Sequence, residues 1–160
     1  MNMKKMSVAL VMLIVLICGI HLPGHSQTSL RKSSFNLGKS GLAIQGYDPV
    51  AYFTQNKAVK GSKEFAVVAD GVTYYFSSQE NKALFKAGYS KYEPQYGGWC
   101  AYAMGASGDK VEIDPETFKI TNGKLYLFYH SWTNNTLNKW NKDEQALKAK
   151  ADANWSALFH

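Results

Sequence analysis

The sequence predicts an α+β fold, in which a small antiparallel sheet from two hairpins carries three or four helices on one face or end. Two observations indicate the hairpins: runs rich in Val, Tyr, Phe and Leu flank the turn-forming Asp-Gly at residues 70–71 and Asn-Gly at residues 122–123. A third observation indicates helices, because capping-box spacing at residues 77–80 and 141–144 precedes apolar stripes.

Residues 1–26 have the pattern of a secretory signal peptide. Two lysines precede the apolar run of residues 6–20, and small and polar residues follow it. The run is shorter than the roughly 18–20 residues that a spanning helix needs, which favours cleavage over a transmembrane anchor. The small side chains of Gly24 and Ser26 place the cut before Gln27.

Lipid attachment at Cys18 is an alternative fate for this leader. It requires a small residue just before the cysteine, and Ile17 stands there. Either way, the pattern predicts an exported protein, periplasmic or extracellular, with no stable membrane span after signal cleavage.

The composition predicts one domain without disulfides and without a nucleic-acid partner. The formal net charge is +6 over 160 residues, and removal of the leader takes away two lysines. The remaining lysines are scattered rather than clustered, unlike those of a nucleic-acid-binding surface. Cys100 would be the single cysteine left, so the fold must depend on its aromatic-rich core.

The first part of the mature chain divides into a tether and the start of the domain. Residues 27–40 are polar and lack sustained periodicity, which predicts a flexible tether before a domain at residues 41–160. We expect a short strand at residues 42–44. A short helix should follow, because Asp48 before a proline is typical of an N-cap with Pro at the first helical position.

The rest of the chain alternates hairpins and helices. The stretch EFAVVADGVTYYFSS predicts the first hairpin, and a helix follows it and ends at Gly88. The stretch TFKITNGKLYLFYH predicts the second hairpin, whose last strand is apolar on both faces and therefore central. A terminal helix carries the apolar stripe Leu147, Ala151, Trp155 and Leu158.

An ordered series of pieces resembles a YHS domain in the longer form of secreted bacterial proteins. The pieces are Asp48-Pro49-Val50, then Tyr74-Tyr75-Phe76 with Ser78, then Phe85 and Tyr92. The stretches PQYGGWCAYA and DPETFKITNGKLYLFY are also similar to that longer form, so the resemblance covers nearly all of residues 41–160. The literal triplet at residues 129–131 does not contribute to it.

The resemblance implies the fold and raises the question of a metal. YHS domains occur in copper-transporting pumps and some multicomponent hydroxylases, and are suspected of binding metal, with copper as the candidate. The cysteines behind that suspicion correspond here to Ala51, Ser77 and Asn81. None of these is a soft ligand of the kind that copper(I) or zinc selects, so the family's metal site does not carry over.

A different soft-metal site would use Cys100, Met104 and His130. The double glycine at residues 97–98 predicts a turn into a helix, whose first turn would favour the Cys100 thiolate. Met104 lies four residues later, on the same helical face. The opposing interpretation is an ordinary core, with a buried thiol, a space-filling methionine and a histidine that caps the strand end.

The sequence therefore favours an exported binding or accessory module rather than an enzyme. Its first candidate ligand is a soft metal such as copper, in a site lined by the aromatic residues Tyr96, Trp99 and Tyr102. The alternative is a metal-free module that binds a small organic ligand or a partner protein through that aromatic pocket. A cysteine-dependent enzyme comes third, since the chain has no local cysteine-hydrolase pattern and we assign no catalytic residue.

Overall fold

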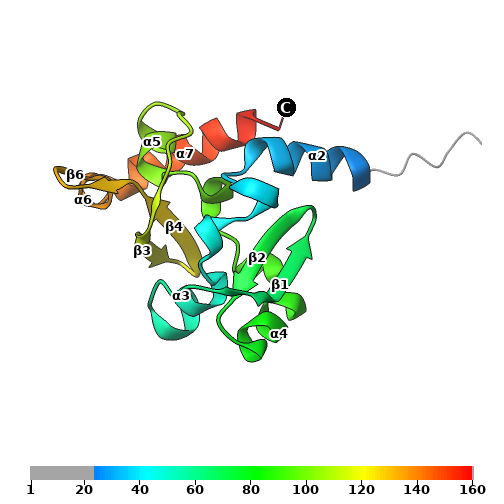
Figure 1. Ribbon diagram of the computed structural model, residues 1–160. Coiled ribbons are helices and arrows are strands. Elements are labelled where there is room, and N and C mark those ends of the chain that lie inside the picture. Colours follow the sequence, from blue (N-terminus) through cyan, green and yellow to red (C-terminus); the bar gives the residue numbers. More distant parts are fainter. Residues whose placement is uncertain (1–23, 160) are drawn as a thin grey trace, which may run out of the picture.

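The computed structural model describes residues 24–159 and confirms the expected α+β class (Figure 1). Most of the expected signal peptide, residues 1–23, lies outside the described part of the chain. The helices are α2 (Gly24–Ser34), α3 (Pro49–Gln55), α4 (Gln79–Ala87), α5 (Ala101–Ala106), α6 (Thr136–Trp140) and α7 (Glu144–Ala157). The strands are β1 (Ser62–Ala69), β2 (Val72–Phe76), β3 (Asp114–Thr121), β4 (Lys124–Phe128), β5 (His130–Ser131) and β6 (Asn134–Asn135).

The described strands form three separate antiparallel pairs, β1–β2, β3–β4 and β5–β6. The first two pairs are the predicted hairpins. Both residues of each turn have positive φ: 45° and 82° at Asp70 and Gly71, and 51° and 69° at Asn122 and Gly123. These left-handed conformations are what a two-residue hairpin turn requires, which explains why the dipeptides predicted the hairpins correctly.

Strand β4 is central, as its two apolar faces indicated. It pairs with β3 on one side, and isolated bridges join Leu125 to Pro94 and Leu127 to Cys100 on the other. The four residues Leu125, Tyr126, Leu127 and Phe128 are all buried. The strand expected at residues 42–44 is reduced to single bridges, because the chain turns at Ile44–Gly46 into a short 3₁₀ helix.

The predicted helix starts hold to within two residues. Asp48 caps α3 as expected, and its carboxylate accepts the N–H groups of Val50 and Ala51. The cap of α4 is Ser78 rather than Ser77, because Ser77 is hydrogen-bonded elsewhere. Helix α7 begins after Asp143 rather than Asn141, since α6 reaches Trp140 and Asn141 is its C-cap.

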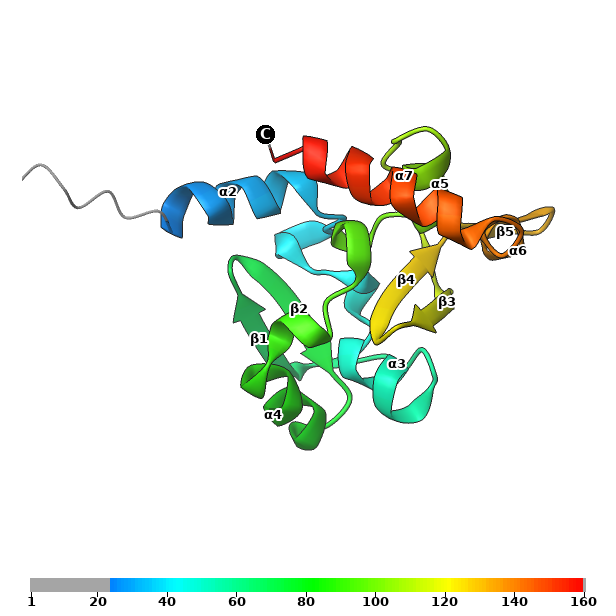
Figure 2. The same cartoon turned by 180° about the vertical axis from the view of Figure 1, so that it is seen from behind.

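The expectation of a flexible tether at residues 27–40 is corrected by the structure. Residues 27–34 of this segment belong to α2, which lies beside the C-terminal end of α7 (Figure 2). Arg31 pairs with Glu93 at 2.5 Å, and the ring centroids of Phe35 and Trp155 are 5.8 Å apart. These long-range contacts hold a polar segment in place, although its own sequence shows no apolar stripe.

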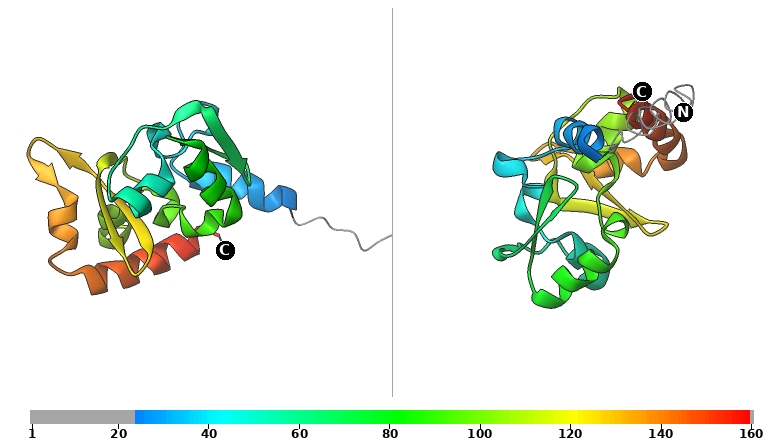
Figure 3. Two further views of the ribbon diagram at one scale, coloured as in Figure 1. Left: turned by 90° about the horizontal axis from the view of Figure 1, so that it is seen from below. Right: turned by 90° about the vertical axis from the view of Figure 1, so that its right-hand side faces the viewer.

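Two buried clusters fill the interior. The larger lies between the first hairpin, α3, α4 and one face of β4. The smaller surrounds Trp140 with Met104, Tyr126 and Phe128. The β5–β6 hairpin lies at the opposite end of the molecule from the β1–β2 hairpin (Figure 3, left), and Trp132 at its turn is fully exposed. Within residues 24–159, no helix combines the length and apolar character needed to span a bilayer.

Candidate functional site

Cys100 is a buried residue at the N-cap of α5. Its side chain has no exposed surface, and its Sγ accepts the backbone N–H of Tyr129 at 3.3 Å. The same sulfur lies 3.4 Å from Oγ1 of Thr136. The thiol thus ties the end of β4 to the start of α6, which is a structural task for a polar atom inside the core.

The structure does not bring the three expected soft ligands into one set of contacts. Met104 is packed in the smaller cluster, whereas Cys100 belongs to the larger one. The imidazole of His130 is 44% exposed, and its Nδ1 lies 3.2 Å from Oγ1 of Thr117 and 3.4 Å from Oδ2 of Asp114. Across residues 24–159, no group of three or more His, Cys, Asp and Glu side chains could hold a metal ion.

The three aromatic residues expected to line a site connect elements instead. Tyr96 is buried and its hydroxyl donates to Oδ1 of Asp152 at 2.9 Å, and burial together with this bond raises the pKa of the phenol. Trp99 donates from Nε1 to the carbonyl of Ser34 at the end of α2. Tyr102 lies under the ammonium of Lys139.

The positions that the family resemblance marks do meet in space, around Asp48. Its Oδ2 accepts the backbone N–H and the hydroxyl of Ser77 at 2.8 and 2.7 Å, and the amide of Asn81 at 2.8 Å. Its Oδ1 accepts the N–H groups of Val50 at 2.8 Å and Ala51 at 3.3 Å. Five donors compensate this fully buried carboxylate, so the Asp48 centre (Asp48, Ser77 and Asn81) is saturated by the protein itself.

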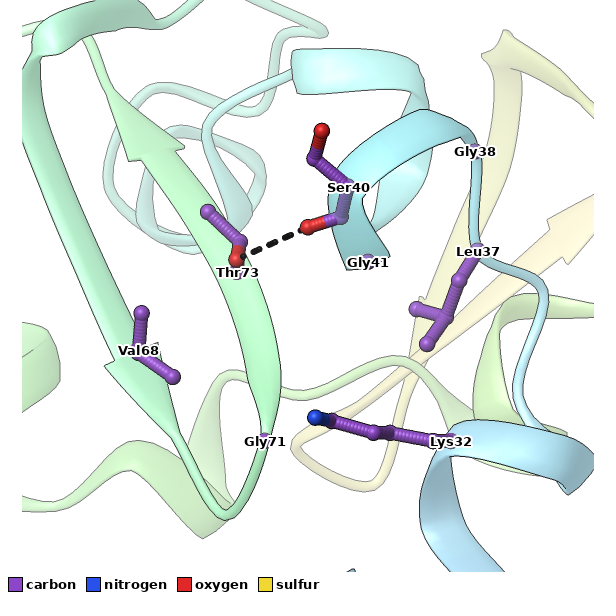
Figure 4. A pocket seen from close by; sticks show the side chains of 8 residues that line it. All are labelled: Lys32, Leu37, Gly38, Ser40, Gly41, Val68, Gly71 and Thr73. Carbon is purple, nitrogen blue, oxygen red and sulfur yellow. Dashed lines mark hydrogen bonds between the residues drawn. The ribbon is translucent and has the colours of Figure 1, made fainter. Parts of the chain in front are cut away.

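An open cleft of about 520 Å³ lies between α2, residues 37–41 and the β1–β2 hairpin (Figure 4). We call it the α2 cleft. It is lined by Lys32, Leu37, Gly38, Ser40, Gly41, Val68, Gly71 and Thr73. The volume falls within the range of about 300–1,000 Å³ that small-molecule sites usually have.

Glycine backbone forms much of the wall of the α2 cleft. Gly71 has φ of +82°, and a Cβ there would lie 2.6 Å from Cγ2 of Thr28 and 2.7 Å from Cε of Lys32. A larger residue would therefore have to displace the side chains of Thr28 and Lys32 on α2, and the positive φ would strain it. Gly41 and Ser40 also have positive φ, at 72° and 61°, which folds residues 38–41 back toward Thr73. The cleft thus depends on local backbone geometry as well as on the docking of α2.

Arg31 and Glu93 fix α2 over the cleft. Glu93 Oε1 accepts from Nη2 of Arg31 at 2.5 Å and from the hydroxyl of Tyr74 at 2.7 Å. Burial disfavours the charge on Arg31, but the hydrogen bond and the charge of Glu93 outweigh it, so the net effect raises the pKa of the guanidinium. The ion pair is partly buried, with side-chain exposures of 19% and 12%.

Reasoning from the sequence missed the α2 cleft because it assigned one wall to a tether. The Asp-Gly dipeptide at residues 70–71 predicted the turn correctly, but no local pattern indicated that α2 would pack on it. Pairing of Arg31 with Glu93, 62 residues later, is a tertiary contact without a sequence signal.

Comparisons with protein-family models, curated proteins and solved structures find no match to this chain. The YHS resemblance therefore stays an expectation from the sequence.

Proposed function

We propose that this chain is an exported, metal-free binding or accessory module that holds a small organic ligand in the α2 cleft. The observation that carries the proposal is the cleft itself, an open volume of about 520 Å³ whose lining includes both polar and apolar groups. Lys32, Ser40 and Thr73 supply polar groups, and Leu37 and Val68 supply apolar surface. Pockets that bind small molecules combine these two kinds of lining.

Export is part of the proposal and is supported by the signal-peptide pattern of residues 1–26. A cut before Gln27 would leave every lining residue of the cleft in the mature protein. It would also leave Arg31, which holds α2 against Glu93. Cleavage and an intact cleft are therefore compatible.

The rival proposal, a copper site at Cys100, Met104 and His130, lacks comparable support. The thiol is fully buried, and the imidazole faces Thr117 and Asp114. The third interpretation, a cysteine nucleophile, meets the same burial, because a reactive thiol has to be reached by its substrate. The buried core interpretation of Cys100 accounts for its contacts without a ligand.

The proposal is tested by ligand-observed NMR with a mixed panel of small organic acids, amines and neutral compounds. Val68 is 67% exposed and lines the cleft, so Val68→Trp should fill the space without disturbing the core. Leu84, 43% exposed on α4 and outside the cleft, provides the matched control Leu84→Trp. At least one panel compound should show saturation transfer from the unmodified protein. This signal should disappear in Val68→Trp and persist in Leu84→Trp.

Two outcomes would contradict the proposal: a panel with no binder at all, or binders that Val68→Trp leaves unaffected. The copper rival is tested beside it by titration with copper(I) under reducing conditions. We expect the protein and its Cys100→Ala variant to give the same titration curve. A stoichiometric site that Cys100→Ala abolishes would restore the metal proposal.

A further inference from the structure

The lining of the α2 cleft carries one kind of charge. Among the described residues that line it, Lys32 is the basic residue and none is a carboxylate. Lys39, which is exposed, stands between the lining residues Gly38 and Ser40. One carboxylate, Asp70, lies in the adjoining turn, where it accepts a hydrogen bond from the Tyr89 hydroxyl. Two lysines in and beside the lining against this one carboxylate leave a positive balance of charge, which favours an anion.

Lys32 extends across the α2 cleft and its ammonium group has no partner among residues 24–159. Its aliphatic stem lies over Gly71, where a Cβ would come within 2.7 Å of Cε. Figure 4 shows the side chain extended from α2 across the cleft toward the strand that carries Thr73. No described residue forms a hydrogen bond or an ion pair with its ammonium group, whereas Arg31 in the preceding position forms an ion pair with Glu93 through Nη2.

The remaining groups favour an organic anion over a simple inorganic one. Val68 is 67% exposed and Leu37 is partly buried, so both offer apolar surface at the cleft. The Thr73 hydroxyl donates a long hydrogen bond of 3.5 Å to the Ser40 carbonyl, and exchanging this weak bond for one to a ligand oxygen costs little. A carboxylate near Lys32 and a short apolar chain over Val68 would use both sides of the cleft.

We infer that the ligand of the α2 cleft is a small organic acid, whose carboxylate pairs with Lys32 and whose apolar part lies against Leu37 and Val68. This inference rests on the proposed function, because it names the ligand class of the same site.

The test compares hexanoate with hexanamide, two probes of nearly equal shape that differ in charge. Titration calorimetry or ligand-observed NMR at low salt should give about fivefold tighter binding of hexanoate, the size of effect that an exposed ion pair can supply. Added salt should remove the preference, because exposed charges are screened. Lys32→Gln should lower hexanoate binding to the amide level, and Lys124→Gln, at the exposed turn of the other hairpin, should not.

Equal binding of hexanoate and hexanamide, or equal effects of Lys32→Gln and Lys124→Gln, would overturn the inference. Loss of both probes in Val68→Trp would in that case still support the proposed function, so the two failures are distinguishable. Inorganic phosphate is the third probe. If phosphate displaced hexanoate from the protein at a concentration equal to that of hexanoate, the apolar part of the assignment would be overturned. Absence of hexanoate binding to the unmodified protein would overturn the inference outright.

Discussion

Strand β2 joins two regions of opposite character. At its start, the α2 cleft presents Lys32 without a partner in the described structure. Just beyond its end, Ser77 takes part in the Asp48 centre, where five donors surround one buried carboxylate. Convergence of polar groups, as at the Asp48 centre, therefore does not by itself make a ligand site. Polar groups that the protein has satisfied hold the fold together, and those left unsatisfied at an open surface can accept a ligand.

Loss of the Asp48 carboxylate should destabilise the fold more than loss of the Cys100 thiol or of the Arg31 guanidinium. Asp48→Ala removes the acceptor of the partly buried Ser77 donors, leaves the Asn81 amide with only a long contact of 3.4 Å to Ser77 Oγ, and removes the N-cap of α3. We expect the free energy of unfolding to fall by about 3 kcal/mol or more, measured by urea denaturation.

Asp109 is exposed and, among residues 24–159, accepts a hydrogen bond from the Ser107 hydroxyl alone. It gives the matched control Asp109→Ala, with a cost below about 0.5 kcal/mol. Equal costs for the two variants would show that the Asp48 centre is not a structural element. Ligand binding in the α2 cleft should survive wherever Asp48→Ala remains folded.

Alkaline pH should destabilise the fold through its buried tyrosines. Burial raises the pKa of Tyr52 and Tyr74 in the folded protein, whereas the unfolded chain ionises its tyrosines near pH 10. Because the folded-state pKa is the higher one, this stability is complete below about pH 10 and is lost as pH rises further, by up to about 1.4 kcal/mol per pH unit for each such tyrosine.

Tyr52→Phe should reduce the slope of stability against pH above pH 10, since it removes one of these groups. The hydroxyl of Tyr52 also donates to the carbonyl of Pro115 at 2.8 Å, so the variant should be less stable at neutral pH. Chemical denaturation at a series of pH values checks both effects. A slope unchanged from the unmodified protein would refute the linkage.

Removal of the Cys100 thiol, another buried acceptor, should cost less stability than removal of the Asp48 carboxylate. Cys100→Ala removes the acceptor of the Tyr129 N–H and a contact of Thr136, and it leaves a small void. We expect a loss of about 2 kcal/mol in unfolding free energy. In the unmodified protein, a thiol reagent should modify Cys100 only under conditions that unfold the chain. Rapid modification of the native protein would place the thiol at the surface and revive its chemical interpretations.

Local signals predicted much of this fold, and long-range contacts decided the rest. The Asp-Gly and Asn-Gly turns and the Asp48 cap depend on neighbouring residues, so the sequence indicated them correctly. The surroundings of Cys100 depend on Tyr129 and Thr136, which lie 29 and 36 residues away. No spacing rule identifies such partners. The sulfur expected in the first turn of a helix lies at the N-cap of α5, where it is buried and accepts the Tyr129 N–H.

The α2 cleft was the least predictable part for the same reason. Its walls come from three segments, and one of them appeared as a tether because a helix docked by a few contacts needs no apolar stripe. The resemblance to YHS domains directed attention to Ala51, Ser77 and Asn81, which the structure gathers at the Asp48 centre. It gave no indication of the opposite end of β2.

Arg31→Ala should have the smallest effect on global stability and a selective effect on the cleft. The variant loses the ion pair with Glu93 and the contact of the guanidinium with the Phe35 ring, 4.5 Å from its centroid. We expect the unfolding free energy to fall by only about 1 kcal/mol, because Glu93 keeps the Tyr74 hydroxyl. Hydrogen exchange should nevertheless accelerate in α2 and leave β4 protected, since α2 is held by few contacts and β4 is buried. Arg31→Lys keeps the charge but loses the planar guanidinium. Its exchange rate in α2 should lie between that of the unmodified protein and that of Arg31→Ala. If α2 stayed as protected as before, the ion pair would not hold the cleft, and the cleft would have to be attributed to the Gly71 contact alone.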